Sequence, residues 1–444
     1  MTSRLRQRAD RLLSSTLRIG VTGLSGAGKS TFLASLINQL ENHTRGALAV
    51  HPRFAGLQSV RWRREAEGGF DYPGALAALT AVPPRWPAST RDLGVARIDL
   101  RYRRGHVLGD LLPQGRLTLE ILDYPGEWLL DLPLLRLDYA QWCAQVEALA
   151  GEPPRRALAG GLFDELAAID PAAPCDEARL RALHARYVDW LRACRALPYR
   201  YSRLTPGRFL LPEGGTLDAS LEFIPLSCGG GAAVPGSWFA VCEARYRDYK
   251  TRCVEPFYTG HFARLDRQVV LVDMLGALES GREALVDMSA ALADVLEHFR
   301  YGSGWLERLV SRRVDRVALC ATKVDHVFPE HQGALQRGME DLLFDTLARL
   351  RHAGVDVRCL PLASVRAARR ADAGGQPVLE GRRIENGAFM RYRPPALPER
   401  LPGDLDVRIE NLPHLAPPDG LHRGDPFPHY RMDSVLDILL GDYL

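Results

Sequence analysis

A short stretch near the amino-terminus, Gly23-Leu-Ser-Gly-Ala-Gly28-Lys29-Ser30, combines glycine, lysine and serine at spacings suited to phosphate chemistry. Glycines at its two ends let backbone N–H groups converge on phosphate oxygens, which Cβ atoms would obstruct. Lys29 would reach the β- and γ-phosphates of a nucleoside triphosphate, and the Ser30 hydroxyl would bind Mg²⁺. We therefore predict a phosphate-binding loop with contacts from Ser25, Gly26, Ala27, Gly28, Lys29, Ser30 and Thr31.

A second stretch, Thr322-Lys323-Val-Asp325, resembles the Asn-Lys-x-Asp motif that recognises guanine, with threonine in place of asparagine. The Asp325 carboxylate can accept hydrogen bonds from guanine N1–H and from the 2-amino group, whereas adenine offers no such pair of donors. Lys323 would lay its aliphatic stem over the base. A later loop, Ala363-Ser364-Val365, is the candidate for a backbone N–H that binds the guanine carbonyl. These residues favour GTP and GDP as ligands.

An acidic turn ends another strand-like run, in Leu119-Glu-Ile-Leu-Asp123-Tyr-Pro-Gly126-Glu127. Asp123 would hold the Mg²⁺ through water, because this ion keeps several waters and takes few protein carboxylates. Gly126 can turn its N–H toward the γ-phosphate and so sense it. Glu127 stands where small GTPases carry glutamine. A carboxylate can orient water as a base, yet it would lie near a very negative phosphate, so a catalytic role for Glu127 is left open.

The segment between these motifs must supply another hydroxyl to the metal. Within it, only Arg85-Trp-Pro-Ala-Ser89-Thr90-Arg91 offers hydroxyls and arginines close together. Thr90 is our first choice as metal ligand and Ser89 our second. Arg85 or Arg91 is a candidate for a built-in arginine finger, which accelerates a slow GTPase by roughly 10³–10⁵. The alternative is a solvated loop held by the packing of Trp86.

Together the motifs predict a Mg²⁺-dependent GTPase that hydrolyses GTP to GDP slowly and acts as a molecular switch. Of 57 basic residues only three are lysine, and two of these are Lys29 and Lys323, where the chemistry favours a compact ammonium. Two alternatives stay open. One is a P-loop ATPase or small-molecule kinase, which equal affinity for ATP and GTP would favour. The other is a nucleotide-gated scaffold with vestigial hydrolysis.

The elements that must position these residues form an α/β pattern. A buried strand over Leu17–Thr22 leads into the phosphate loop, and apolar residues recur at helical spacing after it. Strands that alternate with helices predict a three-layer P-loop NTPase core with a mostly parallel sheet. The expected strands are 95–101, 116–122, 268–273, 317–322 and 357–362, and the expected helices include 284–298, 335–351 and 432–440.

Two stretches interrupt this rhythm. Residues 127–200 predict an inserted α-helical subdomain with Asp176 as a helix N-cap, and the Pro- and Gly-rich residues 373–429 predict a small irregular β-rich extension. The core is then expected in residues 1–126, 240–372 and 430–444, with 201–239 as a linker. We interpret His261 and Asp266 as fixing the start of the next strand, and Asp273 as supporting the site or capping the following turn.

Composition limits the classes of function. The 444 residues are enough for two or more domains, and a formal net charge of +3 gives no support to nucleic-acid binding. No run of 18 apolar residues predicts a membrane span, and eight scattered cysteines without a Cys-x-x-Cys pair favour a reduced, cytoplasmic protein. The basic segment Arg4–Arg11 could contact anionic lipid at the inner membrane, although a solvated helix is the simpler interpretation.

Taken together, the motifs resemble those of the YcjX-like family of bacterial stress-associated P-loop GTPases, and the resemblance covers nearly the whole chain. It implies a Ras-like core with a helical insertion somewhat like that of heterotrimeric G-protein α subunits. It also implies GTP and GDP as ligands and a membrane-protein or regulatory partner, for which the helical insertion is the candidate surface. The motifs are the phosphate loop, Trp86–Arg91, Leu122–Leu129, His261–Gln268, Ala321–Asp325 and the tail Phe427–Asp433.

Overall fold

The computed structural model describes residues 16–23, 26–64, 68–90, 92–103, 114–211, 218–227, 234–298, 314–410 and 412–444. Ser25, Arg91 and the segment Arg4–Arg11 lie outside the described residues. The described chain forms two compact units: the first holds 16–125, 264–281 and 314–444, and the second holds 126–263 and 282–298. Residues 201–263 and 282–298 thus join the helical unit, and 373–429 join the core, which differs from the expected boundaries.

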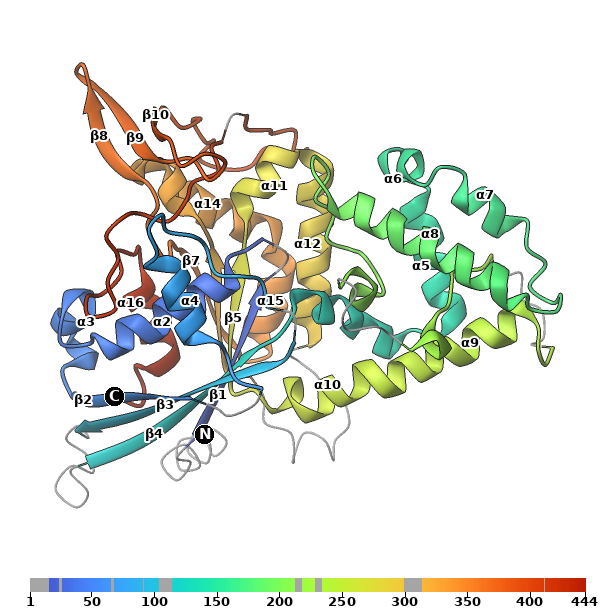
Figure 1. Cartoon of the computed structure of the whole chain (residues 1–444), viewed down its shortest axis with the longest axis horizontal. Coiled ribbons are helices and arrows are strands. Elements are labelled where there is room, and N and C mark those ends of the chain that lie inside the picture. Colours follow the sequence, from blue (N-terminus) through green and yellow to red (C-terminus); the bar gives the residue numbers. More distant parts are fainter. Residues whose placement is uncertain are drawn as a thin grey trace. The chain divides into compact units, whose positions relative to one another are not determined.

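A seven-stranded sheet organises the first unit, in the order β2-β3-β4-β1-β5-β6-β7 (Figure 1). Strand β1 pairs in parallel with β4 and β5, and β5, β6 and β7 continue in parallel, whereas β3 pairs antiparallel with β2 and β4. The predicted mostly parallel sheet is therefore confirmed. The strands are β1 Thr16–Gly23, β2 Leu57–Arg63, β3 Gly94–Arg103, β4 Gln114–Asp123, β5 Arg267–Val272, β6 Arg316–Ala321 and β7 Asp356–Pro361.

Strand β1 lies where the strand order reverses. The chain leaves β1, builds β2 to β4 on one side of it, and returns with β5 on the other side. Nearly all side chains of β1 and β5 are buried, as expected for strands covered on both faces. The carboxyl ends of β1, β4, β5, β6 and β7 meet at one edge of the sheet, and α/β proteins bind ligands at this edge beside the reversal.

Helices α2, α4 and α16 share one apolar core with the sheet. Helices α14 and α15 pack along β7, and Figure 1 shows α2 and α15 on opposite sides of β5. The helices and short turns of this unit are α2 Lys29–Glu41, α3 Gly46–Val50, η1 Pro52–Phe54, α4 Tyr72–Leu79, α11 Met274–Ser280, η8 Val324–His326, α14 Pro329–Leu342, α15 Phe344–His352 and α16 Met432–Leu440, and η6 Phe262–Arg264 precedes β5.

Two features of the first unit differ from expectation. Strand β2 was not expected, because most of its side chains are exposed or half-buried and its arginines obscure the apolar alternation. One helix was expected over 335–351, but the structure has two. The break falls at Leu343, whose φ of −108° and ψ of 13° leave the helical region.

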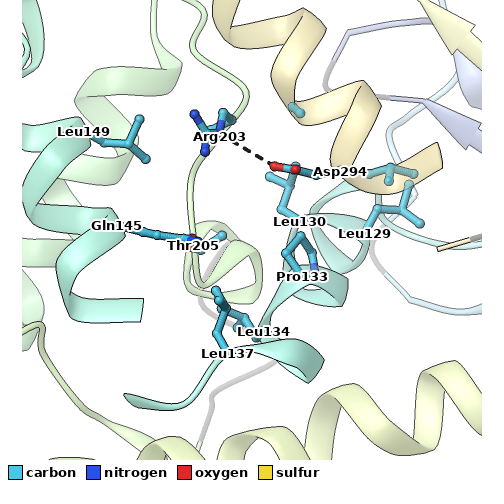
Figure 2. Close-up of a pocket in the computed structure, with 12 residues that line it drawn as sticks. Leu129, Leu130, Pro133, Leu134, Leu137, Gln145, Leu149, Arg203, Thr205 and Asp294 are labelled. Atoms are coloured by element: carbon cyan, nitrogen blue, oxygen red, sulfur yellow. Dashed lines mark ion pairs between the residues drawn. The ribbon is translucent and has the colours of Figure 1, made fainter. Parts of the chain in front are cut away.

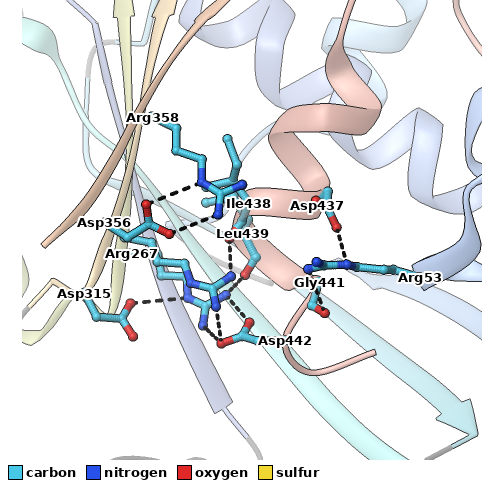
Figure 3. A network of polar contacts seen from close by, with 11 residues as sticks. Arg53, Arg267, Asp315, Asp356, Arg358, Asp437, Ile438, Leu439, Gly441 and Asp442 are labelled. Atoms are coloured by element: carbon cyan, nitrogen blue, oxygen red, sulfur yellow. Dashed lines mark hydrogen bonds and ion pairs between the residues drawn. The ribbon is translucent and has the colours of Figure 1, made fainter. Parts of the chain in front are cut away.

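The end of helix α16 is fixed to the sheet by a buried arginine (Figure 3). Arg267, the first residue of β5, donates from its two terminal nitrogens to the Asp442 carboxylate at 2.7 and 2.6 Å. Its Nε lies 3.5 Å from Asp315, and Arg316 adds an ion pair to Asp442 at 3.0 Å. A guanidinium this deeply buried requires such a bidentate partner, because its desolvation is costly.

A separate three-stranded antiparallel sheet follows β7, with the order β10-β9-β8. The buried Glu380 of the central strand accepts from Arg369 at 2.6 Å and from Arg391 at 3.3 Å on the two neighbouring strands. The strands are β8 Arg369–Ala373, β9 Gln376–Arg382 and β10 Phe389–Tyr392.

The second unit is helical and is built around buried aromatic side chains. The ring of Trp142 contacts those of Tyr187, Phe223 and Tyr246. No helix in the described ranges of the chain is long and apolar enough to cross a membrane. The elements are η2 Gly126–Arg136, α5 Tyr139–Ala150, α6 Pro153–Leu158, α7 Leu162–Ala167, α8 Glu177–Arg195, η3 Gly207–Leu210, η4 Ala219–Leu221, α9 Trp238–Tyr249, η5 Lys250–Val254, α10 Glu255–Gly260 and α12 Arg282–Glu297.

Residues 201–211 and 218–227 have little regular structure, yet they contribute to the core of the second unit. Phe223 and Ile224 are fully buried, and the Tyr139 hydroxyl donates to the Ile224 carbonyl at 2.6 Å. Nearby, a mostly aliphatic pocket has an ion pair between Arg203 and Asp294 on its wall, with 3.7 Å between Nε and the carboxylate (Figure 2). This stretch is therefore part of a packed unit rather than a linker.

Helix α8 of the second unit begins as the sequence predicts. The Asp176 carboxylate accepts from the backbone N–H groups of Ala178 and Arg179 at 3.0 and 3.1 Å. Because the first N–H groups of a helix have no partner within it, this N-cap stabilises the start of the helix.

Candidate nucleotide-binding site

The phosphate loop joins β1 to α2, and glycine shapes its backbone. Gly26 and Gly28 have φ angles of 80° and 85°, in the left-handed region that other residues rarely adopt. A Cβ atom at either position would meet no atom within 4 Å, so conformation and not crowding requires glycine here. Helix α2 begins at Lys29, and no side chain of the described residues caps its first amides. These amides and the helix dipole are therefore oriented to bind an anion.

Three predicted oxygen ligands converge beside the loop, and we call them the oxygen cluster: Ser30, Thr90 and Asp123. Thr90 Oγ1 donates to Asp123 Oδ2 at 2.8 Å, and Ser30 Oγ lies 3.4 Å from Thr90 Oγ1. The three residues come from the start of α2, the segment before β3 and the end of β4. Two hydroxyls and one carboxylate are hard oxygen donors, which is the ligand type that Mg²⁺ takes in nucleotide sites. The residues present therefore fit this ion.

Lys29 lies against the same cluster. Its Nζ is 2.9 Å from Asp123 Oδ1 and also donates to the carbonyl oxygen of Tyr124. Both partners of the ion pair are almost fully buried, with side-chain exposures of 10% for Lys29 and 3% for Asp123. Partial desolvation strengthens the attraction of this ammonium for a phosphate, since less water screens it.

A buried polar cluster joins β1, β4 and β5 near the loop, and sequence reasoning missed it. The Thr22 and Tyr124 hydroxyls are 2.6 Å apart, and Gln268 Nε2 donates to both, at 3.2 Å to Tyr124. Burial raises the pKa of Tyr124 to about 12, so its hydroxyl stays protonated. A Cβ at Gly20 would lie 2.2 Å from Gln268 Oε1, which explains the glycine in β1. The available signal was a glutamine inside an apolar strand run.

Lys323 follows β6 at the same edge of the sheet. Its Nζ donates to Asp273 Oδ2 at 2.6 Å, while Asp273 Oδ1 accepts from the Gly276 amide at 3.0 Å. Asp273 therefore both caps α11 and holds a predicted site residue. Lys323 has a φ of 60°, which is uncommon for a residue with a side chain. The preceding Thr322 is buried, and its N–H donates to the Val272 carbonyl at 2.8 Å.

The Asp325 carboxylate is buried and is partly committed to the protein. Its Oδ2 accepts from the backbone N–H groups of Ala367 and Ala368 at 2.7 and 3.1 Å. Oδ1 is therefore the oxygen left to meet a base. Burial lowers the pKa of the adjacent His326, so this imidazole is neutral at physiological pH.

The carbonyl loop, Ala363–Val365, directly follows β7 beside these residues. Ala363 and Tyr430 exchange two backbone hydrogen bonds at 3.1 and 2.9 Å, so the Ala363 N–H already has a partner. Within the described part of the chain, the N–H groups of Ser364 and Val365 donate to no protein atom. These two amides are the ones that remain for a ligand carbonyl.

The segment before β3 is held by its tryptophan. Trp86 Nε1 donates to the Leu415 carbonyl at 2.8 Å. This contact agrees with the alternative that Trp86 holds a solvated loop in place. Arg85 and Ser89 are exposed, whereas Thr90 belongs to the oxygen cluster and donates to Asp123. The geometry thus favours Thr90 over Ser89 as the metal ligand, and an arginine finger in this segment stays a prediction.

The boundary between the two units falls inside the Asp-x-x-Gly turn, directly before Gly126. In the second unit, Glu127 forms an ion pair with Arg195 of α8, a partner that no signal in the sequence marks. A Cβ at Gly207 would lie 2.0 Å from the Glu127 carbonyl oxygen, so η2 packs tightly there. A role for Gly126 in sensing phosphate and for Glu127 in positioning water stays a prediction.

Asp266 and His261, the two residues expected to fix the start of β5, lie in different surroundings. Asp266 exchanges hydrogen bonds with Arg18 of β1, from the Arg18 N–H to the Asp266 carboxylate and from the Asp266 N–H to the Arg18 carbonyl, both at 2.9 Å. The interpretation that Asp266 fixes the start of β5 is confirmed. His261 lies at the end of α10 in the second unit.

A mostly parallel sheet with a phosphate loop after β1 and a guanine-type motif after β6 defines a GTPase-like protein of Ras-like fold. The chain belongs to the YcjX-like family, DUF463, whose model matches residues 17–444. It is 36% identical to the Ras-like GTPase YcjX of Shewanella oneidensis, over 99% of this chain and 98% of that protein. It is 34% identical to the Ras-like GTPase YcjX of Escherichia coli, over 96% of each chain. The resemblance that the motifs suggest is thus confirmed.

Proposed function

We propose that this protein binds GTP together with Mg²⁺ and hydrolyses it slowly to GDP as a molecular switch. The observation that carries the proposal is the convergence of Lys29 with the oxygen cluster, at distances of 2.8 to 3.4 Å between neighbouring atoms. An ammonium, a carboxylate and two hydroxyls at the start of a helix are the groups that P-loop NTPases use to hold a metal-bound triphosphate.

Each group has a distinct task. Ser30, Thr90 and Asp123 would hold Mg²⁺, which supplies charge neutralisation on the phosphate oxygens. Lys29 and the first amides of α2 bind and orient the phosphates, and they stabilise the charge on the transferring phosphoryl group. Glu127 is the candidate for orienting the attacking water, and Arg85 or Arg91 the candidate for an arginine finger.

Base selectivity is assigned to the other end of the site. Asp325 accepts from the guanine N1–H and 2-amino groups, and the carbonyl loop donates to the 6-carbonyl oxygen. Adenine presents an amino group at position 6 and no N1–H, so both contacts fail. Competition of ATP against labelled GDP tests this assignment, and an ATP affinity equal to that for GTP would favour the ATPase or kinase alternative.

Single-turnover phosphate release tests the proposed hydrolysis. Replacing Lys29 with alanine should slow phosphate release from GTP by about 10²-fold or more, because the ammonium group that stabilises negative charge in the transition state is removed. Lys250→Ala is the matched control, since it removes another of the three lysines. Lys250 donates to the Leu137 carbonyl within the second unit, and its replacement should leave release unchanged. Identical traces for wild type and Lys29→Ala would favour the nucleotide-gated scaffold.

The family resemblance supports a proposal for the physiological role. We place the switch in the bacterial stress response, with the helical second unit as the surface for a regulatory or membrane-protein partner at the cytoplasmic side of the inner membrane. Fractionation of stressed and unstressed cells into membrane and soluble parts tests this placement, and identical distributions would contradict it.

A further inference from the structure

Helix α2 carries a line of polar side chains that the phosphate-binding role leaves unexplained. Ser35, Asn38, Gln39 and Asn42 follow the spacing i, i+3, i+4, i+7, so they share one face of the helix, and we call them the polar stripe. All four are buried, with exposures from 0% to 9%. Buried hydroxyl and amide groups cost free energy unless each finds a hydrogen-bond partner. Their partners therefore indicate what the stripe does.

Three residues of the stripe bind the backbone of the tail segment, which we define as residues 423–430. Asn42 Nδ2 donates to the Arg423 carbonyl at 3.1 Å. Asn38 Nδ2 donates to the carbonyls of Arg423 and Asp425 at 3.3 and 3.1 Å, and its Oδ1 accepts from the Phe427 N–H at 2.8 Å. Gln39 Nε2 donates to the Phe427 carbonyl at 2.8 Å. The phosphate-binding helix thus holds a segment almost 400 residues further along the chain.

The tail segment in turn holds the carbonyl loop. Tyr430 exchanges two backbone hydrogen bonds with Ala363, and the Arg366 N–H donates to the Pro428 carbonyl at 2.7 Å. Ser35 of the stripe adds a direct contact, from its hydroxyl to the Ser364 carbonyl at 2.5 Å. The residues on both sides of Ser364 and Val365 are therefore fixed, while the N–H groups of these two donate to no protein atom in the described ranges.

We propose that the polar stripe and the tail segment position the carbonyl loop, so that selectivity for a purine with a 6-carbonyl depends on residues of the phosphate-binding helix. The inference rests on the proposed function. A backbone N–H accepts no hydrogen bond, so a fixed amide binds the guanine carbonyl and rejects the adenine amino group. A loop free to move would accommodate either base and lose this discrimination.

Equilibrium binding of GDP, ADP, IDP and inorganic tripolyphosphate to the full chain separates the parts of the site. Gln39→Leu removes the hydrogen bond from the stripe to the Phe427 carbonyl of the tail segment, and Ser35→Ala removes the contact to the loop itself. Each should lower the preference for GDP over ADP by about tenfold, the effect of losing one buried hydrogen bond. Tripolyphosphate affinity should stay unchanged. The preference for GDP over IDP should also stay unchanged, because IDP lacks only the 2-amino group that Asp325 binds.

Arg45→Ala is the control. Arg45 also contacts the tail segment, at Gly424 and Asp425, but its side chain is 63% exposed. Its loss should therefore leave the preference for GDP over ADP intact. If Gln39→Leu fails to fold, the milder Ser35→Ala carries the test. Wild type without a preference for GDP would refute the proposed function. If wild type prefers GDP over ADP and both variants keep that preference, only this inference is overturned. The same holds if the variants lose affinity for GDP and for tripolyphosphate to the same extent.

Discussion

Asp123 illustrates how a single side chain serves neighbours of different chemistry. Its two oxygens meet the Lys29 ammonium at 2.9 Å and the Thr90 hydroxyl at 2.8 Å, and only 2% of the residue is exposed. A buried carboxylate is costly unless it is paired and hydrogen-bonded, and here the protein itself supplies both partners. These contacts therefore help to hold the oxygen cluster together.

Thr90 gives the sharpest test at the scale of one residue. Thr90→Ala should raise the Mg²⁺ concentration for half-maximal GTP hydrolysis by about tenfold, because one oxygen ligand and its bond to Asp123 are lost. Thr90→Ser keeps the hydroxyl and should stay near wild type. Magnesium titrations of phosphate release measure both.

The neighbouring hydroxyl provides the control for that experiment. Ser89 is exposed, so Ser89→Ala should leave the magnesium dependence unchanged. A larger effect from Ser89 than from Thr90 would transfer the metal-ligand role to Ser89.

Among the elements, η2 carries a fully buried carboxylate in the interior of the second unit. Asp131 accepts from the Gly207 N–H and the Tyr249 hydroxyl, both at 2.6 Å, and lies 3.7 Å from Arg208. Burial outweighs these partners and raises the pKa of Asp131 to about 6. The turn that follows the Asp-x-x-Gly motif is thus tied to a group that titrates near neutral pH.

This raised pKa predicts a pH-dependent stability. The folded state binds the proton more tightly than the unfolded chain, whose Asp pKa is about 4. The stabilisation is therefore complete below about pH 4 and is lost as the pH rises through about 6. Asp131→Asn does not titrate, so the melting temperature of wild type minus that of the variant should increase as the pH falls from about 7.5 to about 5. Thermal unfolding across this range measures the difference.

An exposed acid of the same unit supplies the comparison. Asp189 has a side-chain exposure of 72% in α8, and Asp189→Asn should give a melting curve that runs parallel to wild type across the same pH range. If the melting temperature of Asp131→Asn also runs parallel to that of wild type across this pH range, the pKa of Asp131 does not differ between the folded and unfolded states.

The elements also show what the sequence could and could not predict. The phosphate loop and most strands were predictable, because glycine spacing and apolar runs follow from local geometry. In α2 the apolar residues predicted the helix. The role of its polar stripe could not be predicted, because the partners of these side chains lie in the distant tail segment. Long-range hydrogen bonds to main-chain atoms leave no residue pattern at the other end. Gln268 was missed because its partners, the hydroxyls of Thr22 and Tyr124, are also far away in the sequence.

At the scale of the whole molecule, the buried Arg267 makes the end of the chain part of the first unit. Arg267→Leu should lower the free energy of unfolding by about 3–5 kcal/mol, because it leaves Asp442 and Asp315 without their buried partner. Arg358→Leu is the matched control, since it breaks an ion pair to Asp356 in which both side chains are exposed, at 55% and 44%. That pair should contribute less than about 1 kcal/mol.

Urea denaturation measures the free energy of unfolding of both variants. Figure 3 shows Arg267 and Arg358 in the same region of the first unit. Equal losses for Arg267→Leu and Arg358→Leu would mean that burial does not strengthen the Arg267 contact. Addition of Asp442→Leu to Arg267→Leu should recover part of the loss, because it removes the carboxylate that has lost its bidentate partner.

The position of helix α16 has a consequence for synthesis on the ribosome. The same apolar core contains Leu17 from β1 and Leu439 from α16, so strand β1 cannot complete its packing until residues made more than 400 positions later leave the ribosome. The second unit, by contrast, draws only on residues 126–298 among those described and is complete long before. A nascent chain that stalls before α16 therefore presents a finished helical unit on an unfinished nucleotide-binding unit, whose exposed apolar strands need a chaperone.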